Sequence, residues 1–332
     1  METWDYHDNH SIAYCMLGYI CAYLRRYYPI EFITSFLNNA ANDDDIAGGT
    51  KLAKLSGFNV ISPRWGFARS NYFFDGESKT ISKGVSSIKS IGESAGNELY
   101  ELAHSREFGS FVDLLLAIKD TSVNSGQLGV LIQLDYFEKF GNQRELLWIV
   151  DMFNYFKRGE AKQVSREAVA GSPFEQAIIR NSNDRTKKGD LAKKYTLLNT
   201  LQIMRECEEV IRSRNLPDLD DITKVKNFVS SMGYAGYTSG KPEDRPKLYI
   251  RDIYPVKRKK DGVQFGYNIL TQSIGSGIES RFTVYNKEFD KAPIHKGDII
   301  YCQRFERDRQ YFDLRAYYHI YNTADDIITA DT

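Results

Sequence analysis

The chain has 332 residues with equal numbers of basic and acidic side chains, and 42% of its residues are apolar. This length predicts two or three domains, and the apolar content is enough to build a core in each. No long apolar run is present, which argues against a membrane-spanning helix. Since the sequence also has no signal peptide, no CxxC and no Cys/His metal spacing, we expect a cytoplasmic protein with reduced thiols and no metal of its own.

The neutral net charge conceals an uneven distribution. Residues 1–150 carry 13 basic and 18 acidic side chains, whereas residues 245–320 carry 15 basic and nine acidic ones. A basic C-terminal module on a neutral chain predicts an anionic partner for that module.

The first predicted element is a helix at residues 11–28. Its apolar residues recur at spacings of three and four, as in an amphipathic helix: Ile12, Met16, Tyr19, Ile20, Tyr23, Leu24 and Tyr27. Arg25 and Arg26 fall in its last turns, where cations suit the helix dipole. Pro29 is expected to end the helix.

The same stretch carries a recognisable pattern: His10-Ser11-Ile12-Ala13-Tyr14, Gly18-Tyr19, Leu24-Arg25 and Tyr28-Pro29-Ile30-Glu31-Phe32. It resembles the fingers region of the C-family bacterial replicative polymerases, the alpha subunits of DNA polymerase III. The resemblance implies that His10 and Arg25 face the triphosphate of the incoming nucleotide, with Ser11 and Tyr14 in support. The alternative is an ordinary amphipathic helix whose arginines only stabilise its end.

The next segment predicts caps and short strands. Asn42-Asp43-Asp44-Asp45 lies in a predicted turn between helices, and we interpret these acids as helix caps rather than as a metal site. A helix is expected at 51–57. Residues 58–63 resemble a strand of the family, and residues 72–74, 80–81 and 84–88 predict a small hairpin.

Residues 84–93, GVSSIKSIGE, resemble the start of the family's helix-hairpin-helix element. Backbone N–H groups at such a helix N-terminus can hold a DNA phosphate without reading sequence. We therefore predict DNA contacts at Lys89 and Gly92. Ser90 replaces a glycine of the family and makes the turn less permissive, and a plain strand-turn-helix is the alternative. Further matches at 108–113, 128–137 and 141–144 extend the resemblance over about residues 10–148.

Residues 151–244 predict a helical region, with helices at 165–179 and 197–212 and a polar loop at 180–189. Family members often carry a peptide here that binds the sliding clamp. Asp151-Met152-Phe153 echoes that peptide faintly, without its initial glutamine. The sliding clamp is therefore the weakest of the predicted partners.

From residue 247 onward the pattern changes to five short strands with turns between them, which is typical of an OB-fold. We place the strands at 248–254, 264–271, 277–284, 298–305 and 311–319. The first hairpin carries four adjacent cations before Gly262: Lys257, Arg258, Lys259 and Lys260. They predict a grip on single-stranded DNA, the alternative being a solvated turn.

Three further residues of this module are candidate DNA contacts. Phe265 and Tyr267 follow the cations and could stack on bases, although burial in the core is the alternative for each. Arg281, on the third predicted strand, adds a cation.

These features predict an α+β multidomain protein, mostly helical at first and ending in a five-stranded β-barrel. We expect fingers helices with a small strand segment at 1–82, a helix-hairpin-helix region at 83–150, the helical region at 151–244, an OB-fold at 245–320 and an acidic tail at 321–332. The expected partners are template DNA, both single-stranded and duplex.

A polymerase of this family also needs palm carboxylates, usually in a D-x-D pair on a strand, to hold two metal ions. The spaced acids Asp218/Asp220 and Glu306/Asp308 occur in a polar linker and a hairpin turn, and we reject both pairs. We therefore expect a DNA-binding polymerase part that is inactive alone, with a palm-bearing chain in trans that holds Mg²⁺. The alternatives are a standalone polymerase-derived DNA-binding or inhibitory protein and an unrelated OB-fold protein.

Overall fold

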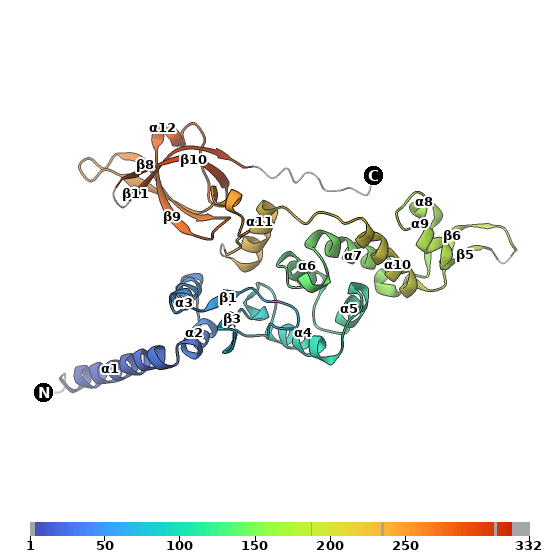
Figure 1. The fold of residues 1–332 in the computed structure, drawn as a ribbon, viewed down its shortest axis with the longest axis horizontal. Helices are drawn as coiled ribbons and strands as arrows, with labels where there is room; N and C mark the ends of the chain where they lie inside the picture. Colours follow the sequence, from blue (N-terminus) through green and yellow to red (C-terminus); the bar gives the residue numbers. More distant parts are fainter. Residues whose placement is uncertain (1–3, 187, 234–235, 309–310, 321–332) are drawn as a thin grey trace. The chain divides into compact units, whose positions relative to one another are not determined.

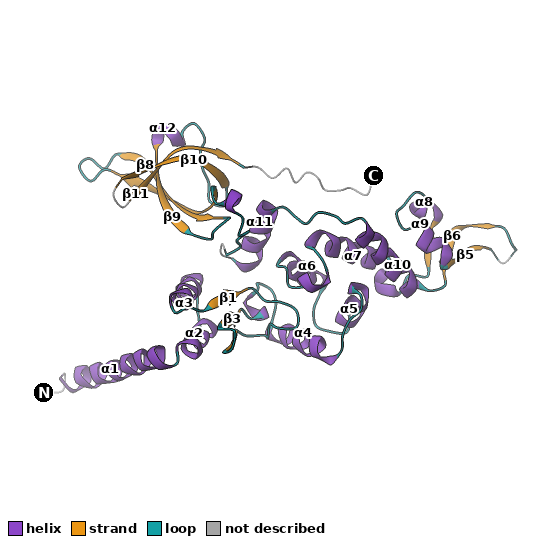
Figure 2. Ribbon diagram, in the orientation of Figure 1, coloured by secondary structure: helices purple, strands orange, loops and turns teal. Residues whose placement is uncertain are grey.

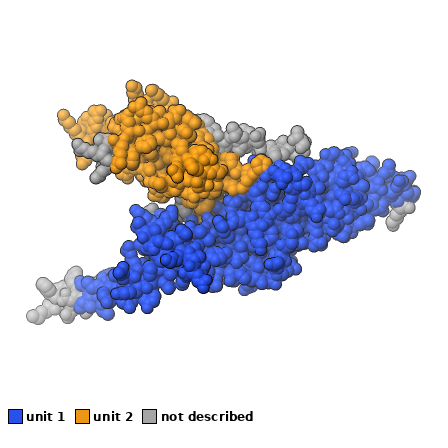
Figure 3. Space-filling view, viewed as in Figure 1, with its two compact units in different colours: residues 1–216 blue, residues 217–332 orange. Residues whose placement is uncertain are grey.

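The computed structural model describes residues 4–186, 188–233, 236–308 and 311–320. They divide into two compact units, Met1–Leu216 and Pro217–Thr332, which Figure 3 colours separately. The first unit is mostly helical, and the second contains a closed five-stranded barrel (Figure 2). The predicted α+β fold class is therefore confirmed. The predicted acidic tail lies outside the described residues.

The N-terminal helices follow the predicted caps but not every predicted end. Helix α1 (Trp4–Tyr27) starts earlier than predicted. Pro29 does separate it from the next segment, but it also opens helix α2 (Pro29–Asn38), where a missing N–H costs nothing. Helix α3 (Asp43–Leu55) begins after Asn42, whose side chain accepts a hydrogen bond from the Asp45 N–H at 2.9 Å.

A small sheet follows, with the strand order β1 (Asn59–Ile61), β3 (Thr80–Ser82), β2 (Phe73–Asp75). Strands β2 and β3 form the predicted hairpin, and β1 adds in parallel. Residues 84–88 are not a third hairpin strand, because a 3₁₀ turn η1 (Val85–Ser87) forms there. That turn is held by the Ser86 hydroxyl and N–H, which both donate to the carbonyl of Ser70.

Four helices make up the helix-hairpin-helix region: α4 (Glu93–Ser105), α5 (Phe111–Ile118), α6 (Ser125–Gln133) and α7 (Gln143–Tyr155), with the 3₁₀ turn η2 (Glu138–Phe140) before α7. Their core is aromatic, because Phe111, Tyr136 and Phe137 are fully buried. The Trp65 ring, from the loop after β1, packs against Tyr136 and Phe137. This core joins the loop after β1 to helix α5 and to the segment between α6 and η2.

The rest of the first unit is less helical than predicted. After the 3₁₀ turn η3 (Lys157–Gly159), the single helix predicted at 165–179 is two short ones, α8 (Arg166–Val169) and α9 (Glu175–Arg180). The predicted loop at 180–189 contains a strand. Strands β4 (Gln163–Ser165), β6 (Leu191–Leu197) and β5 (Ser182–Arg185) form an antiparallel sheet in that order, and helix α10 (Thr200–Ser213) closes the unit.

A contact between a half-buried arginine and a buried tyrosine holds this sheet together. Tyr195 of β6 is buried, and the Arg166 guanidinium lies over its ring at 4.5 Å and donates to its hydroxyl at 3.1 Å. Arg166 also pairs with Asp184 of β5 at 3.1 Å. One side chain thus joins α8 to both strands of the hairpin.

The second unit contains the barrel and the helices around it (Figure 1). Its elements are α11 (Asp221–Met232), the 3₁₀ turn η4 (Pro242–Asp244), β7 (Lys247–Lys257), β8 (Gln264–Ser273), β9 (Glu279–Tyr285), α12 (Asn286–Phe289), β10 (Ile299–Asp308) and β11 (Tyr311–His319). The strand order β10-β11-β9-β8-β7 closes through β7 and β10, and only β9 with β11 is parallel. All five predicted strands are present, with ends within three residues of those predicted.

Alternation of side chains fills the barrel. Ile250, Ile269, Phe282, Ile300 and Leu314 point inward and are buried. At one end of the barrel, Val225 of α11 packs against Tyr249, Ile274 and Ile299. Helix α11, predicted within the helical region, therefore belongs to the barrel unit, which begins at residue 217 instead of 245.

Candidate nucleic-acid interface

The turn before α4 presents a short exposed segment between two buried anchors. Ile88 and Ile91 are buried, whereas Lys89 and Ser90 are exposed. Ser90 has a φ of +69°, a conformation that favours glycine. Its carbonyl accepts a hydrogen bond from the Gln127 side chain at 2.6 Å, which pins the turn to the start of α6. The predicted contacts Lys89 and Gly92 therefore lie on one well-positioned turn.

Helix α4 differs from its three neighbours at its N-terminus. Ser110, Asn124 and Asn142 each cap the following helix with a side-chain oxygen, at α5, α6 and α7. At α4 the N-cap is Gly92, which has no side chain to offer. The first-turn N–H groups of α4 can therefore donate hydrogen bonds to an outside anion such as a phosphate. Glu93 opposes this, although its carboxylate is engaged by the Asn71 side chain at 2.7 Å.

Gly84 allows the close packing on which this turn depends. A Cβ atom at Gly84 would lie 2.2 Å from the backbone oxygen of Ser70. The segment between β3 and α4 can thus pack directly against the backbone at Ser70 only because residue 84 is glycine.

The cations of the first barrel hairpin are all exposed, as expected for a turn ended by glycine. Gly262 has a φ of +69°, and its N–H donates to the Arg258 carbonyl at 2.9 Å. Arg258 lies 3.9 Å from Asp261. Lys257, Lys259 and Lys260 have no ion-pair partner in the described part of the chain, so three cations project from one turn.

One of the two predicted stacking residues, Tyr267, faces the barrel interior. Tyr267 pairs with the buried Val284 and lies on the side of β8 that carries the core residue Ile269, whereas Phe265 lies at a β-bulge, where the alternation of sides is interrupted. The Tyr267 ring is stacked on Phe289 of α12 at 3.9 Å, and Phe265 lies 6.0 Å from Tyr285. Both are half-buried. One face of Tyr267 is therefore already covered by protein.

The outer face of β7, β8 and β9 carries an aromatic residue that sequence reasoning missed. Tyr254 is 48% exposed and pairs with Asn268, while the exposed Arg281 pairs with Leu270 on the same face. Alternate residues of a strand lie on opposite sides of the sheet, so Asn268 and Leu270 lie opposite the side of Ile269. This alternation can be read from the sequence and would have identified the outer face. Tyr254 and Arg281 lie on the strands that the basic hairpin joins or borders.

Helix α1 places three of the four predicted nucleotide contacts along one side. Ser11, Gly18 and Arg25 follow one another at intervals of seven residues, so they lie on one side of the helix, and Tyr14 lies beside them. Ser11 and Arg25 are roughly 21 Å apart along the axis, so they cannot meet one phosphate group together. The His10 backbone belongs to α1, but its side chain lies outside the described residues.

Arg25 borders a groove of about 720 Å³ beside α2 and α3. The groove is lined by apolar and basic residues together: Gly18, Cys21, Ala22, Arg25, Arg26, Phe32, Phe36 and Leu52. Such a groove offers an apolar surface and a cation to a bound group. The other predicted contacts, Ser11 and Tyr14, do not line it.

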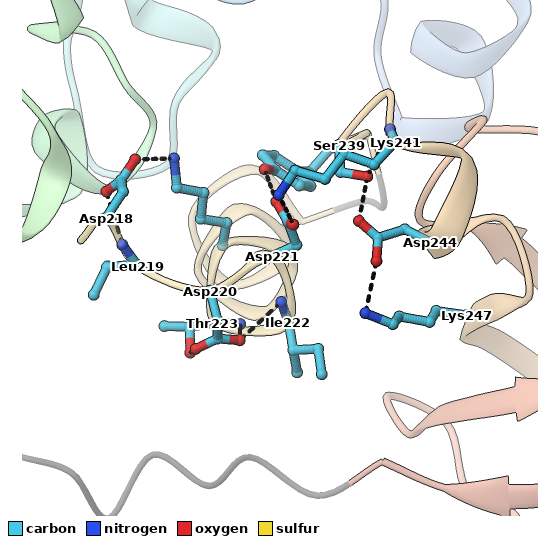
Figure 4. A network of polar contacts seen from close by, with 12 residues as sticks. Asp218, Leu219, Asp220, Asp221, Ile222, Thr223, Ser239, Lys241, Asp244 and Lys247 are labelled. Atoms are coloured by element: carbon cyan, nitrogen blue, oxygen red, sulfur yellow. Dashed lines mark hydrogen bonds and ion pairs between the residues drawn. The ribbon is translucent and has the colours of Figure 1, made fainter.

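The spaced acids of the second unit serve structural roles (Figure 4). Asp218 pairs with Lys224 at 2.6 Å, and Asp220 caps α11 by accepting from the N–H groups of Ile222 and Thr223. Glu306 pairs with Arg304 and Arg315; the Asp308 side chain lies outside the described residues. No group of three metal-ligating residues occurs in the described part of the chain. These donors do not fit a two-metal polymerase site.

Two further segments bear on the predicted partners. Met152 and Phe153 are buried within α7, so this faint clamp-peptide echo is not presented at the surface. The β5–β6 hairpin, which sequence reasoning took for a loop, exposes a set of cations: Arg185, Lys188, Lys193 and Lys194. The glycine at 189, with a φ of +87°, was the signal for that turn.

Comparison with known proteins agrees with this geometry. A family model for the helix-hairpin-helix motif matches residues 60–147. The DNA polymerase III alpha subunit of Bacillus subtilis is 29% identical over 146 residues, covering 44% of this chain and 13% of that protein. That of Thermus aquaticus is 30% identical over 147 residues (44% and 12%), and that of Ureaplasma parvum is 21% identical over 270 residues (81% and 24%).

The resemblance predicted from the sequence is thereby confirmed: the chain is similar to part of the DNA polymerase III alpha subunit. It spans less than a quarter of the length of these relatives. The helix-hairpin-helix match and the polymerase relatives support a DNA-binding, polymerase-related role.

Proposed function

We propose that this chain is the DNA-binding, non-catalytic part of a replicative DNA polymerase of the alpha-subunit type, completed by a palm-bearing polypeptide in trans. The observation that carries the proposal is the uncapped N-terminus of α4 inside the matched helix-hairpin-helix region. It offers backbone N–H groups next to Lys89, which suits a DNA backbone phosphate.

The two units would hold different forms of DNA. Phosphate contacts at the α4 turn require only the DNA backbone, so they suit duplex DNA behind the growing primer end. The barrel hairpin, with three unpaired lysines, suits the flexible single strand, and Tyr254 on the outer face could stack on a base. Neither contact reads base edges, as a replicative enzyme that copies any template requires.

The nucleotide role of α1 belongs to the same proposal. Arg25 borders the groove with one charge that could meet a triphosphate oxygen, and the apolar wall formed by Phe32 and Phe36 could support a base or sugar. Chemistry at the primer end would come from the partner's carboxylates and Mg²⁺, because the spaced acids Asp218, Asp220 and Glu306 are occupied as a helix cap or in ion pairs.

Fluorescence anisotropy with labelled primer–template and single-stranded DNA tests the DNA-binding part. Binding to both, weakening steeply with salt, is the expected result. Primer extension with Mg²⁺ and four nucleotides tests the rest: the chain alone should incorporate nothing. Absence of DNA binding at low salt, or clear synthesis by the pure chain, would contradict the proposal.

A further inference from the structure

Helix α1 exposes an unusually large apolar surface. Ile12, Met16, Leu17 and Tyr19 are 59%, 60%, 58% and 72% exposed. Ile20, Tyr23, Leu24 and Tyr27 on the same helix are also exposed. From Ser11 to Leu24 the sequence has no charged residue. An exposed patch of this extent marks a surface that another molecule covers.

The width of this surface restricts what can cover it. At about 100° per residue, those eight side chains spread over roughly 160° of the helix circumference. A helix that lies on the surface of its own domain needs only about 100°. A single partner helix, such as α1 of a second copy, would therefore leave part of the surface in water, whereas a folded domain with a concave surface covers it.

The composition of the surface favours protein over lipid. Tyr19, Tyr23 and Tyr27 form a ladder, with ring centroids 6.5 and 4.7 Å apart. Tyrosine combines a large apolar ring with a hydroxyl that needs a hydrogen-bond partner, and it is enriched in protein interfaces. Among the helices that the structure describes, none has the length and apolarity needed to cross a bilayer.

We infer that α1 is a docking element that inserts into a concave apolar surface of the palm-bearing polypeptide. This inference rests on the proposed function. The matched relatives extend well beyond the aligned part, which leaves 76–88% of their length for domains that have no counterpart in the alignment. Such domains are large enough to enclose a helix on more than one side. The tyrosine ladder would lie at the centre of the interface.

The test places p-benzoylphenylalanine at Tyr19 of the full chain in the organism that encodes it, followed by irradiation and mass spectrometry. The expected adduct contains a polypeptide whose sequence carries the palm carboxylates. The control places the same amino acid at Leu198, which is also 72% exposed, and should give no such adduct. An adduct with a second copy of this chain or with lipid, or no adduct, would overturn the inference.

A second measurement uses the purified partner and point variants. Met16→Glu and Tyr23→Glu should each weaken the complex at least about tenfold, whereas Leu198→Glu should leave its Kd within about twofold. Circular dichroism shows whether α1 still folds. DNA binding by the same proteins separates the two proposals. If the variants bind both the partner and DNA as the wild type does, only the docking role is refuted. If the wild type itself does not bind DNA, the proposed function is refuted.

Discussion

The carboxylate of Glu208, on α10, caps helix α5 at Phe111: its Oε1 accepts the Phe111 N–H at 2.9 Å, and its Oε2 accepts the Val112 N–H at 2.9 Å. Arg212 completes the site with a 2.6 Å ion pair. Glu208 is only 3% exposed. A protein carboxylate thus occupies this helix N-terminus, which leaves the one at α4 for an outside anion.

Replacing Glu208 by Ala should destabilise the first unit by about 3 kcal/mol, because two buried N–H groups and the Arg212 charge lose their partner. Urea denaturation followed by tryptophan fluorescence is suitable, since Trp4, Trp65 and Trp148 all lie in this unit. Glu209→Ala, exposed on the same helix, is the control and should change little. Equal stability of the two variants would contradict the capping role.

Ser90→Gly should stabilise the first unit by about 1 kcal/mol. Ser90 adopts a left-handed φ of +69°, which costs an L-residue energy that glycine does not pay. Ser90→Ala keeps the strained conformation and should give no gain, which makes it the matched control. The same denaturation experiment measures both variants, and a stabilisation by alanine equal to that by glycine would argue against backbone strain.

The Lys259→Ala/Lys260→Ala double variant should flatten the log–log salt dependence of single-stranded DNA binding by about 1.4, at about 0.7 per phosphate contact. Since phosphate contacts carry no sequence information, the weakening should be similar on any template. Lys287→Ala/Lys291→Ala is the control, because it removes two exposed lysines in and just after helix α12 of the same barrel unit. If both double variants retain the wild-type slope, the basic hairpin is only a solvated turn.

Stability of the first unit should rise above pH 8 because of Lys83. Burial, with a smaller contribution from the Lys54 charge, lowers the pKa of Lys83 to about 8. Between that pH and the ordinary lysine pKa near 10.5, the unfolded chain keeps a proton that the folded chain releases, so the free energy of unfolding increases with pH. Below pH 8 both states are charged, and the buried charge costs about 3 kcal/mol.

Lys83→Met should therefore stabilise the unit at pH 7 by up to about 3 kcal/mol and flatten its pH dependence from pH 7 to 9.5. Lys51→Met, at an exposed position of α3, should do neither. Urea denaturation across this pH range measures both effects. A wild-type stability that falls from pH 7 to 9 would show the opposite sign and reject the assignment.

Arg25→Ala should raise the apparent KM for nucleotides in the reconstituted polymerase, because a charge that meets the triphosphate is lost. Lys51→Ala removes an exposed charge of α3 that does not line the groove, and it is the control. Steady-state primer extension at varied nucleotide concentration gives both values. An unchanged KM for Arg25→Ala would leave the arginine with a role at the helix end only.

The barrel was predictable because each of its strands alternates and ends at a turn residue. Phe282 stands between the polar residues Arg281 and Thr283, and Gly262 and Gly297 mark turns. The β4–β6–β5 sheet was not, since Ser182-Asn183-Asp184-Arg185 is polar throughout and its strand nature depends on Arg166, which lies far away in the sequence.

Part of the candidate site was also predictable from the sequence. The exposure of the basic hairpin followed from its glycine-ended turn. The need for glycine at 84 depends on the backbone of Ser70, a contact that no local pattern contains. Tyr267 was a poor stacking candidate, because it has the same parity as the buried Ile269 and therefore lies on the inner side of β8.

The parallel pairing of β9 with β11 also determines when the barrel can form during synthesis. Strand β11 is the last of the five to be synthesised, and it pairs with both β9 and β10. Until residue 319 has left the ribosome, those two strands have open edges that can pair with other chains. The helical first unit, with its shorter-range contacts, can fold while the barrel strands are still being translated. The lysine-rich hairpin between β7 and β8 therefore reaches solvent before the barrel to which it belongs has closed.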